Sequence, residues 1–477
     1  QRIEPFIRDL HRDPNRAYTA VGILTEGGDW HGRHIHDIAV LGGAADLAGA
    51  MAFLAQRRIR PQRLIIADDE ISESSISQFL DMASDHGLTV GRLPRLMDFN
   101  DDSAAQARVA RPIVLADLLG RPQAVLDRAA LRKLLQGQRV LITGAGGSIG
   151  SELVRQICAF QPSRLVLLEN SEFNLYSIGQ ELDGRDDCPP NRYVLCDVRD
   201  EVSLHRVFAE ERPDIVFHAA ALKHVPLVEA NPVEGVHTNV IGTRNLAEAC
   251  AQFAVRAMVM ISTDKAVNPH NIMGASKRWA EAYCQAMDLA EGDTRFTAVR
   301  FGNVLGSNGS VAPLFQKQLA AGGPITVTHP DVTRFFMTIP EAVQLVLQAS
   351  ATGIAAQAPR GEVYVLDMGK PIKIVDLARQ MIRLSGKQPD VDIKIEFIGL
   401  RPGEKLHEEL VHEHENHTAP AGDGAFAVSP RTTDLAILRR QIGELARAVS
   451  AHDEDKVLRL IRSAVPEFLF QGQAAGQ

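Results

Sequence analysis

The sequence predicts an α/β protein built on a Rossmann-type, doubly wound parallel sheet. Apolar runs of strand length alternate with helical patterns between residues 137 and 260, and the first run, 140–143, leads straight into a glycine-rich turn that opens a helix. Strands that alternate with helices form a parallel sheet covered on both faces. Because ligands of such sheets bind beyond the carboxyl ends of the strands, functional residues are expected there.

The turn after the first strand reads Thr143-Gly-Ala-Gly-Gly-Ser-Ile-Gly and predicts a dinucleotide site. A pyrophosphate binds free backbone N–H groups at a helix N-terminus, where the helix dipole also favours negative charge. Glycines permit the tight turn, the close approach to phosphate and the close helix packing. The residues expected at the cofactor from this turn are Gly144, Ala145, Gly147, Ser148, Ile149 and Gly150.

An acidic residue is expected about 20 residues further on to hold the ribose hydroxyls. The strand 165–169 ends in Glu169, which fits, although a surface acid is the alternative. Two later strands, 192–198 and 214–221, end in residues that extend the cofactor site, because small side chains let the backbone approach the nicotinamide. These are Asp197, Val198, Ala219, Ala220 and Ala221.

The strand 258–262 continues into Thr263-Asp264-Lys265, and Met273 stands four residues before Lys277. This arrangement resembles a short-chain dehydrogenase active site in which Met replaces the usual catalytic Tyr. A thioether has no acid–base capacity. Proton transfer must then come from elsewhere, and Thr263, Asp264 and Lys265 offer a hydroxyl, a carboxylate and an amine in a row. A purely structural Asp–Lys salt bridge is the alternative.

Six segments together carry a narrower resemblance, which spans residues 113–415. They begin at Thr143, His218 (His-Ala-Ala-Ala-Leu-Lys-His-Val-Pro), Ser262, Met273, Arg300 (Arg-Phe-Gly-Asn-Val-Leu-Gly-Ser) and Arg401 (Arg-Pro-Gly-Glu-Lys-Leu-His-Glu). The chain is similar to extended short-chain dehydrogenases/reductases that dehydrate nucleotide sugars. In particular it resembles the large, membrane-anchored UDP-N-acetylglucosamine 4,6-dehydratases of bacterial capsule, O-antigen and glycan biosynthesis.

The resemblance implies a redox-neutral conversion of UDP-N-acetylglucosamine to UDP-2-acetamido-2,6-dideoxy-4-hexulose with a catalytic NAD. Asp264 would protonate the departing C-6 hydroxyl, Lys265 would remove the C-5 proton and Thr263 would bond the C-4 oxygen. Lys277 would hold the nicotinamide ribose. NAD is expected over NADP because Glu169 repels a 2′-phosphate. The Met variant belongs to the large members, which favours retention at C-5.

Alternatives remain at this point. A C-5-inverting dehydratase or a 4-epimerase would use the same scaffold, and a non-catalytic dinucleotide sensor would also lack the Tyr. Residues 300–415 are expected to bind the substrate, and basic side chains suit its diphosphate, although each could be a surface charge. The substrate-binding candidates are Lys223, Asn303, Lys317, Arg334, Arg401 and Glu404.

The stretch with His407, His412, His414 and His417 is interpreted as a solvated, Glu-rich helix end, with no metal site. Five scattered cysteines show no zinc spacing and no disulfide framework. The net charge of −8 does not favour nucleic-acid binding. No apolar run reaches the ~18 residues of a membrane span, so we expect a soluble chain.

The domain prediction is a smaller, truncated Rossmann-like domain over 1–110, a linker over 111–136, the dehydratase domain over 137–470 and a disordered tail over 471–477. In the N-terminal part, strands are expected at 20–25, 38–42 and 63–69 and helices at 2–10, 44–57 and 75–86. The family resemblance implies preceding membrane helices, a position on the cytoplasmic side of the inner membrane, and a homo-oligomer.

Overall fold

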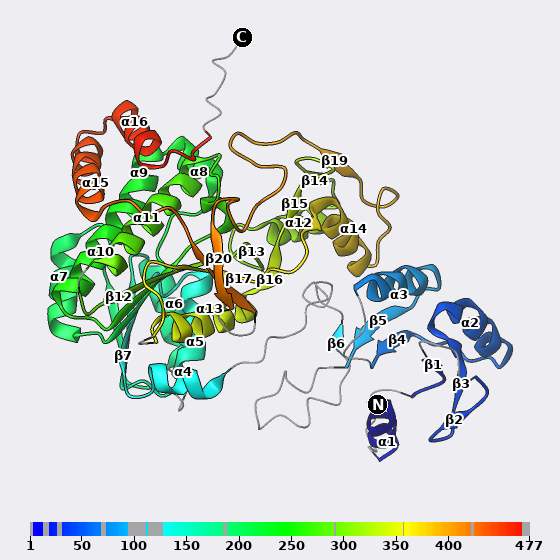
Figure 1. Ribbon diagram of the computed structural model, residues 1–477. Helices are drawn as coiled ribbons and strands as arrows, with labels where there is room; N and C mark the ends of the chain where they lie inside the picture. The colour runs from blue at the N-terminus through cyan, green and yellow to red at the C-terminus, as the bar shows by residue number, and fades with distance from the viewer. Residues whose placement is uncertain are drawn as a thin grey trace, which may run out of the picture. The chain divides into compact units, whose positions relative to one another are not determined.

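The computed structural model describes residues 3–12, 19–25, 31–67, 73–93, 111–112, 127–183, 185, 188–290, 292–355, 357–420 and 424–469. The chain divides into two compact units (Figure 1). One comprises 1–122, 315–326 and 375–396, and the other comprises 123–314, 327–374 and 397–477. The predicted tail, 471–477, and most of the predicted linker lie outside the described residues, apart from its two ends, 111–112 and 127–136.

The larger unit is organised around a nine-stranded sheet with the order β20-β21-β17-β12-β11-β10-β7-β8-β9. All neighbours from β17 to β9 run parallel, and β21 and β20 are added antiparallel. The predicted doubly wound sheet is thereby confirmed. The strands are β7 (Arg139–Thr143), β8 (Arg164–Glu169), β9 (Asn191–Leu195), β10 (Ile215–His218), β11 (Ala257–Ile261), β12 (Arg295–Arg300), β17 (Val363–Leu366), β20 (Asn416–Pro420) and β21 (Ala425–Ser429).

Successive residues of the central strands serve two separate cores. In β7, Leu141 belongs to one buried apolar cluster and Ile142 to the other, as the period of two in a strand requires. The first cluster is completed by α7 (Glu201–Glu211), α10 (Thr243–Gln252), α11 (Ile272–Leu289), α15 (Leu435–Ser450) and α16 (Glu454–Ala464). The second is completed by α4 (Arg128–Leu135), α5 (Ser148–Cys158), α6 (Glu172–Leu182) and α13 (Ile339–Gly353).

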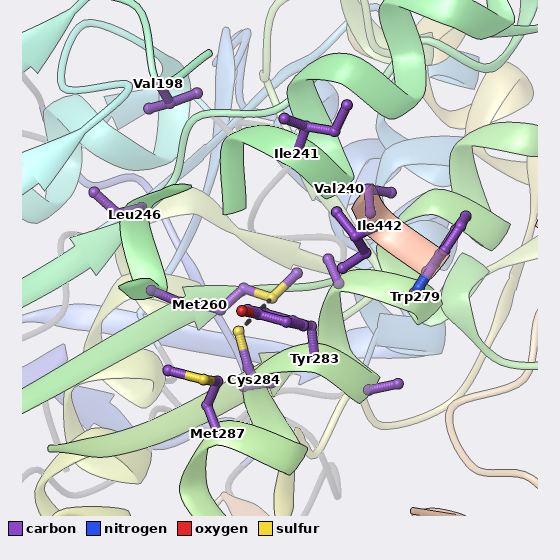
Figure 2. Packing of buried hydrophobic residues seen from close by; sticks show 14 of the residues in the cluster. Val198, Val240, Ile241, Leu246, Met260, Trp279, Tyr283, Cys284, Met287 and Ile442 are labelled. Carbon is purple, nitrogen blue, oxygen red and sulfur yellow. Dashed lines mark hydrogen bonds between the residues drawn. The ribbon is translucent and has the colours of Figure 1, made fainter. Parts of the chain in front are cut away.

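Helix α11 is almost entirely buried, which fixes its position against the sheet. Figure 2 shows Trp279, Tyr283 and Cys284 of this helix directed into the first core beside Met260 of β11 and Ile442 of α15. Burying a large apolar side chain contributes roughly 1.5–3 kcal/mol. The helix that carries Met273 and Lys277 is therefore held by packing along its whole length.

Short elements lie between the main strands of the sheet. They include two short helices, a π-helical turn that leads directly into α10, and a 3₁₀ turn directly after β11. The elements are α8 (Val225–Ala230), α9 (Pro232–Val236), the π-helix His237–Gly242, the 3₁₀ turn Asp264–Ala266, β13 (Asn303–Leu305), α12 (Val311–Ala320), β14 (Ile325–Val327), β15 (Thr333–Arg334), β16 (Phe336–Thr338), β18 (Ile372–Lys373), α14 (Ile374–Leu384) and β19 (Ile395–Phe397).

The N-terminal part contains two three-stranded sheets, β1-β3-β2 and β4-β5-β6, each with one parallel pair. Every expected helix and strand of this part is present within a few residues of its expected bounds. The elements are α1 (Ile3–Arg12), β1 (Ile23–Thr25), β2 (His34–Ile35), β3 (Ile38–Gly43), the 3₁₀ turn Ala44–Asp46, α2 (Leu47–Gln56), β4 (Arg63–Ile66), α3 (Glu73–Asp85), β5 (Thr89–Arg92) and β6 (Arg111–Pro112). No helix among the described residues combines the length and apolarity of a membrane span.

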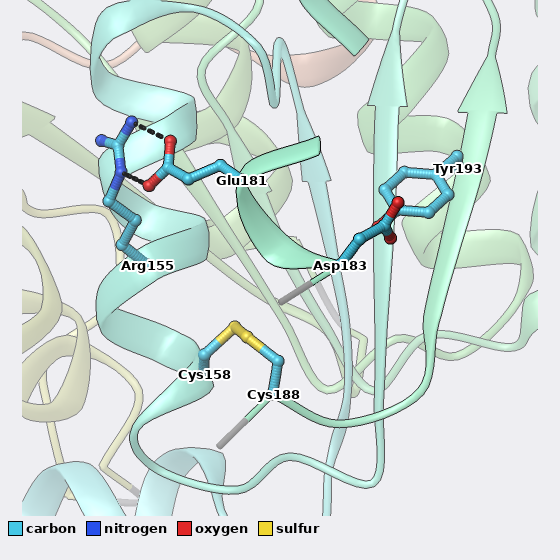
Figure 3. Close-up of a disulfide and its surroundings, with 6 residues drawn as sticks. All are labelled: Arg155, Cys158, Glu181, Asp183, Cys188 and Tyr193. Carbon is cyan, nitrogen blue, oxygen red and sulfur yellow. Dashed lines mark hydrogen bonds and ion pairs between the residues drawn. A yellow bond between two sulfur atoms is a disulfide. The ribbon is translucent and has the colours of Figure 1, made fainter. Parts of the chain in front are cut away.

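One expectation about the cysteines is wrong. Cys158, at the end of α5, forms a disulfide with Cys188, which lies before β9 (Figure 3). The two are 30 residues apart in sequence, but the parallel β8–β9 pairing returns the chain to the same edge of the sheet as the end of α5. Sequence spacing could not show this proximity. Cys196, Cys250 and Cys284 are free and buried.

Candidate active site

The glycine turn has the close backbone packing that a dinucleotide site requires. Gly144 adopts a left-handed φ of 63°, and a Cβ there would lie 2.7 Å from the backbone nitrogen of Ala220. A Cβ at Gly150 would lie 1.9 Å from the Gly144 carbonyl oxygen. Strand β7, the turn and α5 are therefore locked together by positions that only glycine can occupy. Gly147 is the N-cap of α5, so the helix N-terminus opens at the turn.

Glu169 ends β8 and is 6% exposed. Its carboxylate accepts hydrogen bonds from the backbone N–H groups of Gly146 (3.0 Å), Asn170 (3.1 Å) and Ser171 (3.1 Å). These contacts tie the glycine turn to the next strand and fix the orientation of the acid. Glu169 is thus a positioned carboxylate at the end of its strand, and the surface-acid alternative does not fit its burial.

A cavity of about 590 Å³ lies at the carboxyl ends of β7, β8 and β10. The residues that line it come from several separate parts of the predicted cofactor set. Among them are Gly144, Gly147, Glu169, Asp197, Val198, Ala219, Ala220 and Ala221, and the cavity is also lined by Lys223, which was expected to bind the substrate. Arg199 also lines the cavity, where it forms ion pairs with Asp197 (2.7 Å) and Glu234 (2.7 Å). The sequence interpretation missed Arg199.

A chain of hydrogen bonds connects the end of β7 to the π-helix. The side chain of His218 lies between the hydroxyls of Thr143 (2.8 Å) and Thr243 (2.9 Å). Thr243 donates its proton to the Asn239 carbonyl, so it accepts from Nε2–H of His218, and Thr143 donates to Nδ1. Burial lowers the pKa of His218 to about 3, with Lys277 adding to the effect, so the imidazole is neutral.

The same chain of bonds reaches α11. The side-chain amide of Asn239 donates to the Ser276 hydroxyl (2.9 Å), and that hydroxyl donates to the Met273 carbonyl (2.7 Å). Met273 is 3% exposed and belongs to the first apolar core. Lys277 is 5% exposed, and burial lowers its pKa to about 8 although Glu281 opposes the change.

Thr263, Asp264 and Lys265 form one hydrogen-bonded cluster at the end of β11. Asp264 is completely buried, and its Oδ1 accepts from the Thr263 hydroxyl (2.9 Å) and from the ammonium of Lys265 (3.0 Å). Its Oδ2 is buried with no hydrogen-bond partner among the described residues. A buried carboxylate oxygen in this state costs free energy. It is therefore a candidate to bond a ligand group.

Lys265 is surrounded by acceptors. Besides Asp264, its ammonium contacts Asn303 Oδ1 at 3.0 Å and Glu408 Oε1 at 3.6 Å. Burial alone would lower the pKa of Lys265, but the negative charges of Asp264 and Glu408 outweigh it and raise the pKa above its usual value. The resting lysine is therefore an ammonium, and it has to lose a proton before it can act as a base.

Two buried ion pairs, both formed by Arg300, lie next to this cluster. Arg300 is fully buried between Glu281 of α11 and Glu415, at 2.8 Å from each. Glu281 also accepts from the hydroxyl of Ser262, the residue before Thr263. On the other side, a Cβ at Gly274 would lie 2.1 Å from the Lys265 carbonyl oxygen. Helix α11 is therefore fastened directly to the residues that can transfer protons.

The substrate-binding candidates have different environments. Arg334 is buried and donates to Glu404 (3.1 Å), to the carbonyls of Thr333, Lys405 and Leu406, and lies 3.7 Å from Glu408. Its donors are thus engaged by protein groups. Lys223 and Arg401 are exposed. Lys317 is an exposed residue of α12 and belongs to the other compact unit, so the described site does not include it.

The helix end expected around His407, His412, His414 and His417 is wrong, because residues 407–415 form turns, bends and irregular loop and His417 lies in β20. His407 and His414 are exposed, as expected, but Glu408 and Glu415 are both only 9% exposed. The charges of Lys265, Arg334 and Arg300 draw the two glutamates inward. No local pattern could have separated them from Glu409, whose side chain is 51% exposed. The sequence analysis therefore missed Glu408 and Glu415, and it missed Glu281 as well.

Taken together, the parallel sheet, the glycine turn at its switch point and the Thr-Asp-Lys cluster define an extended short-chain dehydrogenase/reductase fold. The family model described as "Polysaccharide biosynthesis protein" matches residues 140–430. The chain belongs to this family, as the motifs predicted.

Known relatives agree with this placement. The chain is 47% identical over 365 residues to the capsular polysaccharide biosynthesis protein CapD of Staphylococcus aureus, covering 76% of this chain and 59% of that protein. It is 43% identical over 420 residues to the probable polysaccharide biosynthesis protein EpsC of Bacillus subtilis, covering 86% and 67%. It is 33% identical over 297 residues to the UDP-N-acetylglucosamine 4,6-dehydratase (inverting) of Campylobacter jejuni, covering 61% and 83%.

Solved structures show the same fold. The X-ray structure of Pen from Bacillus thuringiensis matches with a TM-score of 0.56 and 34% identity, over 63% of this chain and 89% of that one. The DesIV double mutant of Streptomyces venezuelae, a dTDP-glucose 4,6-dehydratase with NAD and DAU bound, matches with a TM-score of 0.50 and 23% identity, over 57% and 88%. The second similarity concerns the fold alone.

Proposed function

We propose that this protein is a nucleotide-sugar 4,6-dehydratase that acts on UDP-N-acetylglucosamine in the synthesis of a bacterial surface polysaccharide. The observation that carries the proposal is the hydrogen-bonded Thr263–Asp264–Lys265 cluster at the end of β11, with Asp264 fully buried, beside a helix with Met273 in place of a phenol. The cluster supplies an acid, a base and a relay hydroxyl within hydrogen-bond distance of one another. The Campylobacter relative at 33% identity supports the choice of reaction and substrate.

The described residues fit a nicotinamide dinucleotide. The glycine turn leaves no room for a Cβ at Gly144 or Gly150, and the adjoining cavity is lined by Glu169 and the three alanines after β10. Gly144 to Gly150 would hold the pyrophosphate, Glu169 the adenosine ribose, and Lys277 the nicotinamide ribose. When bound, the nicotinamide would supply a reversible acceptor for the hydride that moves from C-4 to C-6 of the sugar. The carboxylate of Glu169 disfavours a 2′-phosphate, so we propose NAD as the cofactor in preference to NADP.

The protein's own groups would move the protons. The Thr263 hydroxyl donates to Asp264 at 2.9 Å, so a sugar C-4 hydroxyl bound to Thr263 would pass its proton through the threonine hydroxyl to the carboxylate. Protonated Asp264 then donates this proton to the departing C-6 hydroxyl. Neutral Lys265 removes the C-5 proton, which the 4-keto group acidifies. Met273 and the rest of α11 provide an apolar wall that keeps water away.

The reaction's outcome at C-5 is a separate part of the proposal. Met273 in place of Tyr favours retention, whereas the dehydratases among the relatives are named as inverting. The UDP-glucose 4-epimerase of Rickettsia akari is also 33% identical over 305 residues, so an epimerase is the second candidate.

One experiment separates these possibilities. The protein is incubated with UDP-N-acetylglucosamine and the product is followed by proton NMR. Dehydration gives a C-6 methyl signal, and the presence or absence of a nuclear Overhauser contact between H-3 and H-5 gives the configuration at C-5. A C-4 epimer without a methyl group would replace this proposal by the epimerase, and an unchanged sugar with bound dinucleotide would favour the sensor.

The cofactor preference has its own test. Glu169→Ala should raise the affinity for NADP relative to NAD by tenfold or so, because it removes about one charge–charge repulsion at the ribose. Titration of the purified protein with each dinucleotide measures this ratio. A wild type that already binds NADP more tightly than NAD contradicts the assignment of Glu169.

A further inference from the structure

We propose that Glu408 is a third proton-transfer group of this site, which holds the proton of Lys265 while that amine acts as the base. The inference rests on the proposed dehydration. It concerns a residue outside the Thr-Asp-Lys run, carried by the turn that follows Arg401 and Glu404.

The need for a third group follows from counting protons. The resting cluster holds Lys265 as an ammonium and Asp264 as a carboxylate. Loss of the C-4 hydroxyl proton to Asp264 leaves both groups protonated. Elimination needs the proton on Asp264, for the departing hydroxyl, but an empty amine on Lys265, for the C-5 proton. One proton must therefore leave Lys265 without returning to Asp264.

Glu408 is placed to receive it. Its Oε1 lies 3.6 Å from the Lys265 ammonium, and its side chain is 4% exposed. The other oxygen, Oε2, is buried with no hydrogen-bond partner among the described residues, so the carboxylate has capacity for a proton. The distance of 3.6 Å exceeds a hydrogen bond by a few tenths of an ångström. A rotation of the lysine side chain away from Asp264, once that carboxylate is neutral, closes this gap.

Among the residues that the structure describes, no other neighbour of Lys265 can take the proton. Asn303 contacts the ammonium through its amide oxygen, which is not a base at neutral pH. Arg334 is already cationic, and its Nε lies 3.7 Å from the same Oε1 of Glu408. Glu404 bonds to Arg334, to the backbone N–H of Arg401 and to Thr328.

The charges around Glu408 are balanced so that either protonation state is accessible. Burial and the carboxylate of Asp264 raise its pKa, whereas Lys265, Arg334 and Lys405 lower it, and the net effect is a raised pKa. Protonation of Asp264 removes negative charge from Lys265 and so weakens its hold on a proton. The same protonation also removes the effect of Asp264 on Glu408, but Lys265, whose ammonium lies 3.0 Å from Asp264 Oδ1, is the group in direct contact with the lost charge, so transfer from Lys265 to Glu408 is favoured when the amine is needed.

After elimination the cycle resets with no net change. Lys265 carries the C-5 proton and returns it, or one exchanged with it, to C-5 when the sugar is reduced at C-6. Glu408 then gives its stored proton back to Lys265. Bond by bond, one proton travels from Lys265 to Glu408 and back, and no oxidant or reductant is required for this exchange.

The test measures proton exchange at C-5 of the isolated 4-keto product, made with the wild-type protein, in D2O by NMR. Asp264→Asn serves as the background because asparagine is uncharged, like the protonated acid, and cannot take the lysine proton. In this background the exchange rate should be nearly independent of pH from about 6 to 8, since the Lys265–Glu408 pair keeps its proton number. In Asp264→Asn/Glu408→Gln it should rise about tenfold per pH unit, because Lys265 must then lose its proton to solvent.

Conservative and matched variants complete the design. Asp264→Asn/Glu408→Asp keeps a carboxylate and should restore the flat profile, whereas Asp264→Asn/Glu409→Gln changes the exposed neighbour and should leave it flat. UDP binding and thermal melting of each variant show that it is folded. In an otherwise wild-type protein, Glu408→Gln should make the rate of dehydration rise by about tenfold per pH unit between about pH 6 and 8.

The inference is overturned if the C-5 exchange rate of the Glu408→Gln variants does not depend on pH. It is also overturned if the exchange rate changes with pH by the same factor with and without the Glu408 carboxylate. Either result can be obtained while the wild type dehydrates its substrate normally. Failure of the proposed function is a different result, in which the wild type forms no 4-keto product at all.

Discussion

The two halves of the site are built in different ways. The dinucleotide half lies within one strand–turn–helix, with Gly144 and Gly150 a few residues apart and Glu169 at the end of the neighbouring strand. The proton-transfer half gathers Lys265, Asn303 and Glu408 from separate parts of the chain, and it includes the buried carboxylates of Asp264 and Glu408. In the first half, the backbone packs so closely that Gly144 and Gly150 have no room for a Cβ. In the second half, the carboxylates of Asp264 and Glu408 are buried away from water.

This difference determines how each half responds to change. The glycine turn Gly144–Gly150 has no room for added atoms at Gly144 and Gly150, but its contribution to dinucleotide binding is spread over many backbone N–H groups. A cluster of buried charges is sensitive to the loss of a single partner, because the remaining charge is left without compensation. The largest effects are therefore expected in the proton-transfer half.

The first prediction concerns the acid and the base. Asp264→Asn and Lys265→Ala should each lower turnover by about 100-fold or more, the scale of a positioned general acid or base. The affinity for UDP should stay nearly unchanged, since neither residue is placed at the diphosphate. Steady-state kinetics with UDP titrations measures both quantities. Wild-type turnover in either variant would move the chemistry to another part of the molecule.

The second prediction tests the close packing of the glycine turn by comparing alanine substitutions at two glycines. Gly144 (φ 63°) and Gly137 (φ 71°) share a left-handed backbone, but only at Gly144 would a Cβ meet backbone atoms. Both alanine variants cost about 1 kcal/mol in backbone strain. Gly144→Ala should also weaken dinucleotide binding by at least about tenfold, since the turn must open. Equal dinucleotide affinities for the two variants, by calorimetry, would show that the close packing is unimportant for binding.

The third prediction concerns the buried charge of Lys277. Its pKa of about 8 in the folded protein lies below the usual 10.5, so between these values the unfolded chain binds more protons and stability rises with pH. From about pH 7.5 to 9.5 the wild type should gain on the order of 1–2 kcal/mol of unfolding free energy relative to Lys277→Met. Denaturant unfolding at the two pH values measures the difference. A parallel pH dependence in both proteins would mean that Lys277 titrates normally.

Most residues that the sequence predicts for the dinucleotide half lie together at the glycine turn and the adjoining cavity, because the determinants of this arrangement are local. The steric demands on Gly144 and Gly150 and the place of Glu169 at a strand end are visible in a pattern about 30 residues long. In the other half it predicted the adjacent residues Thr263, Asp264 and Lys265. It missed Glu408, Glu281 and Arg199, because their burial and pairing depend on contacts between segments distant in sequence. The Cys158–Cys188 disulfide was missed for the same reason.

The smallest expected effect concerns Met273, which belongs to the apolar wall between the two halves. It is 3% exposed among the core residues of the first cluster, and its backbone carbonyl accepts a hydrogen bond from the Ser276 hydroxyl. Met273→Leu keeps volume and apolarity, and such swaps are usually tolerated. Turnover should fall by less than about tenfold, which corresponds to under ~1.4 kcal/mol of barrier.

Met273→Tyr is the informative partner of this variant. If Thr263, Asp264 and Lys265 move the protons, an added phenol has no task, and its hydroxyl enters an apolar core without a partner, so turnover should not rise. Both variants are compared with wild type in the same NMR assay. A large gain from tyrosine would show that the site is a weakened form of the usual one, and would shift the balance toward the dinucleotide sensor.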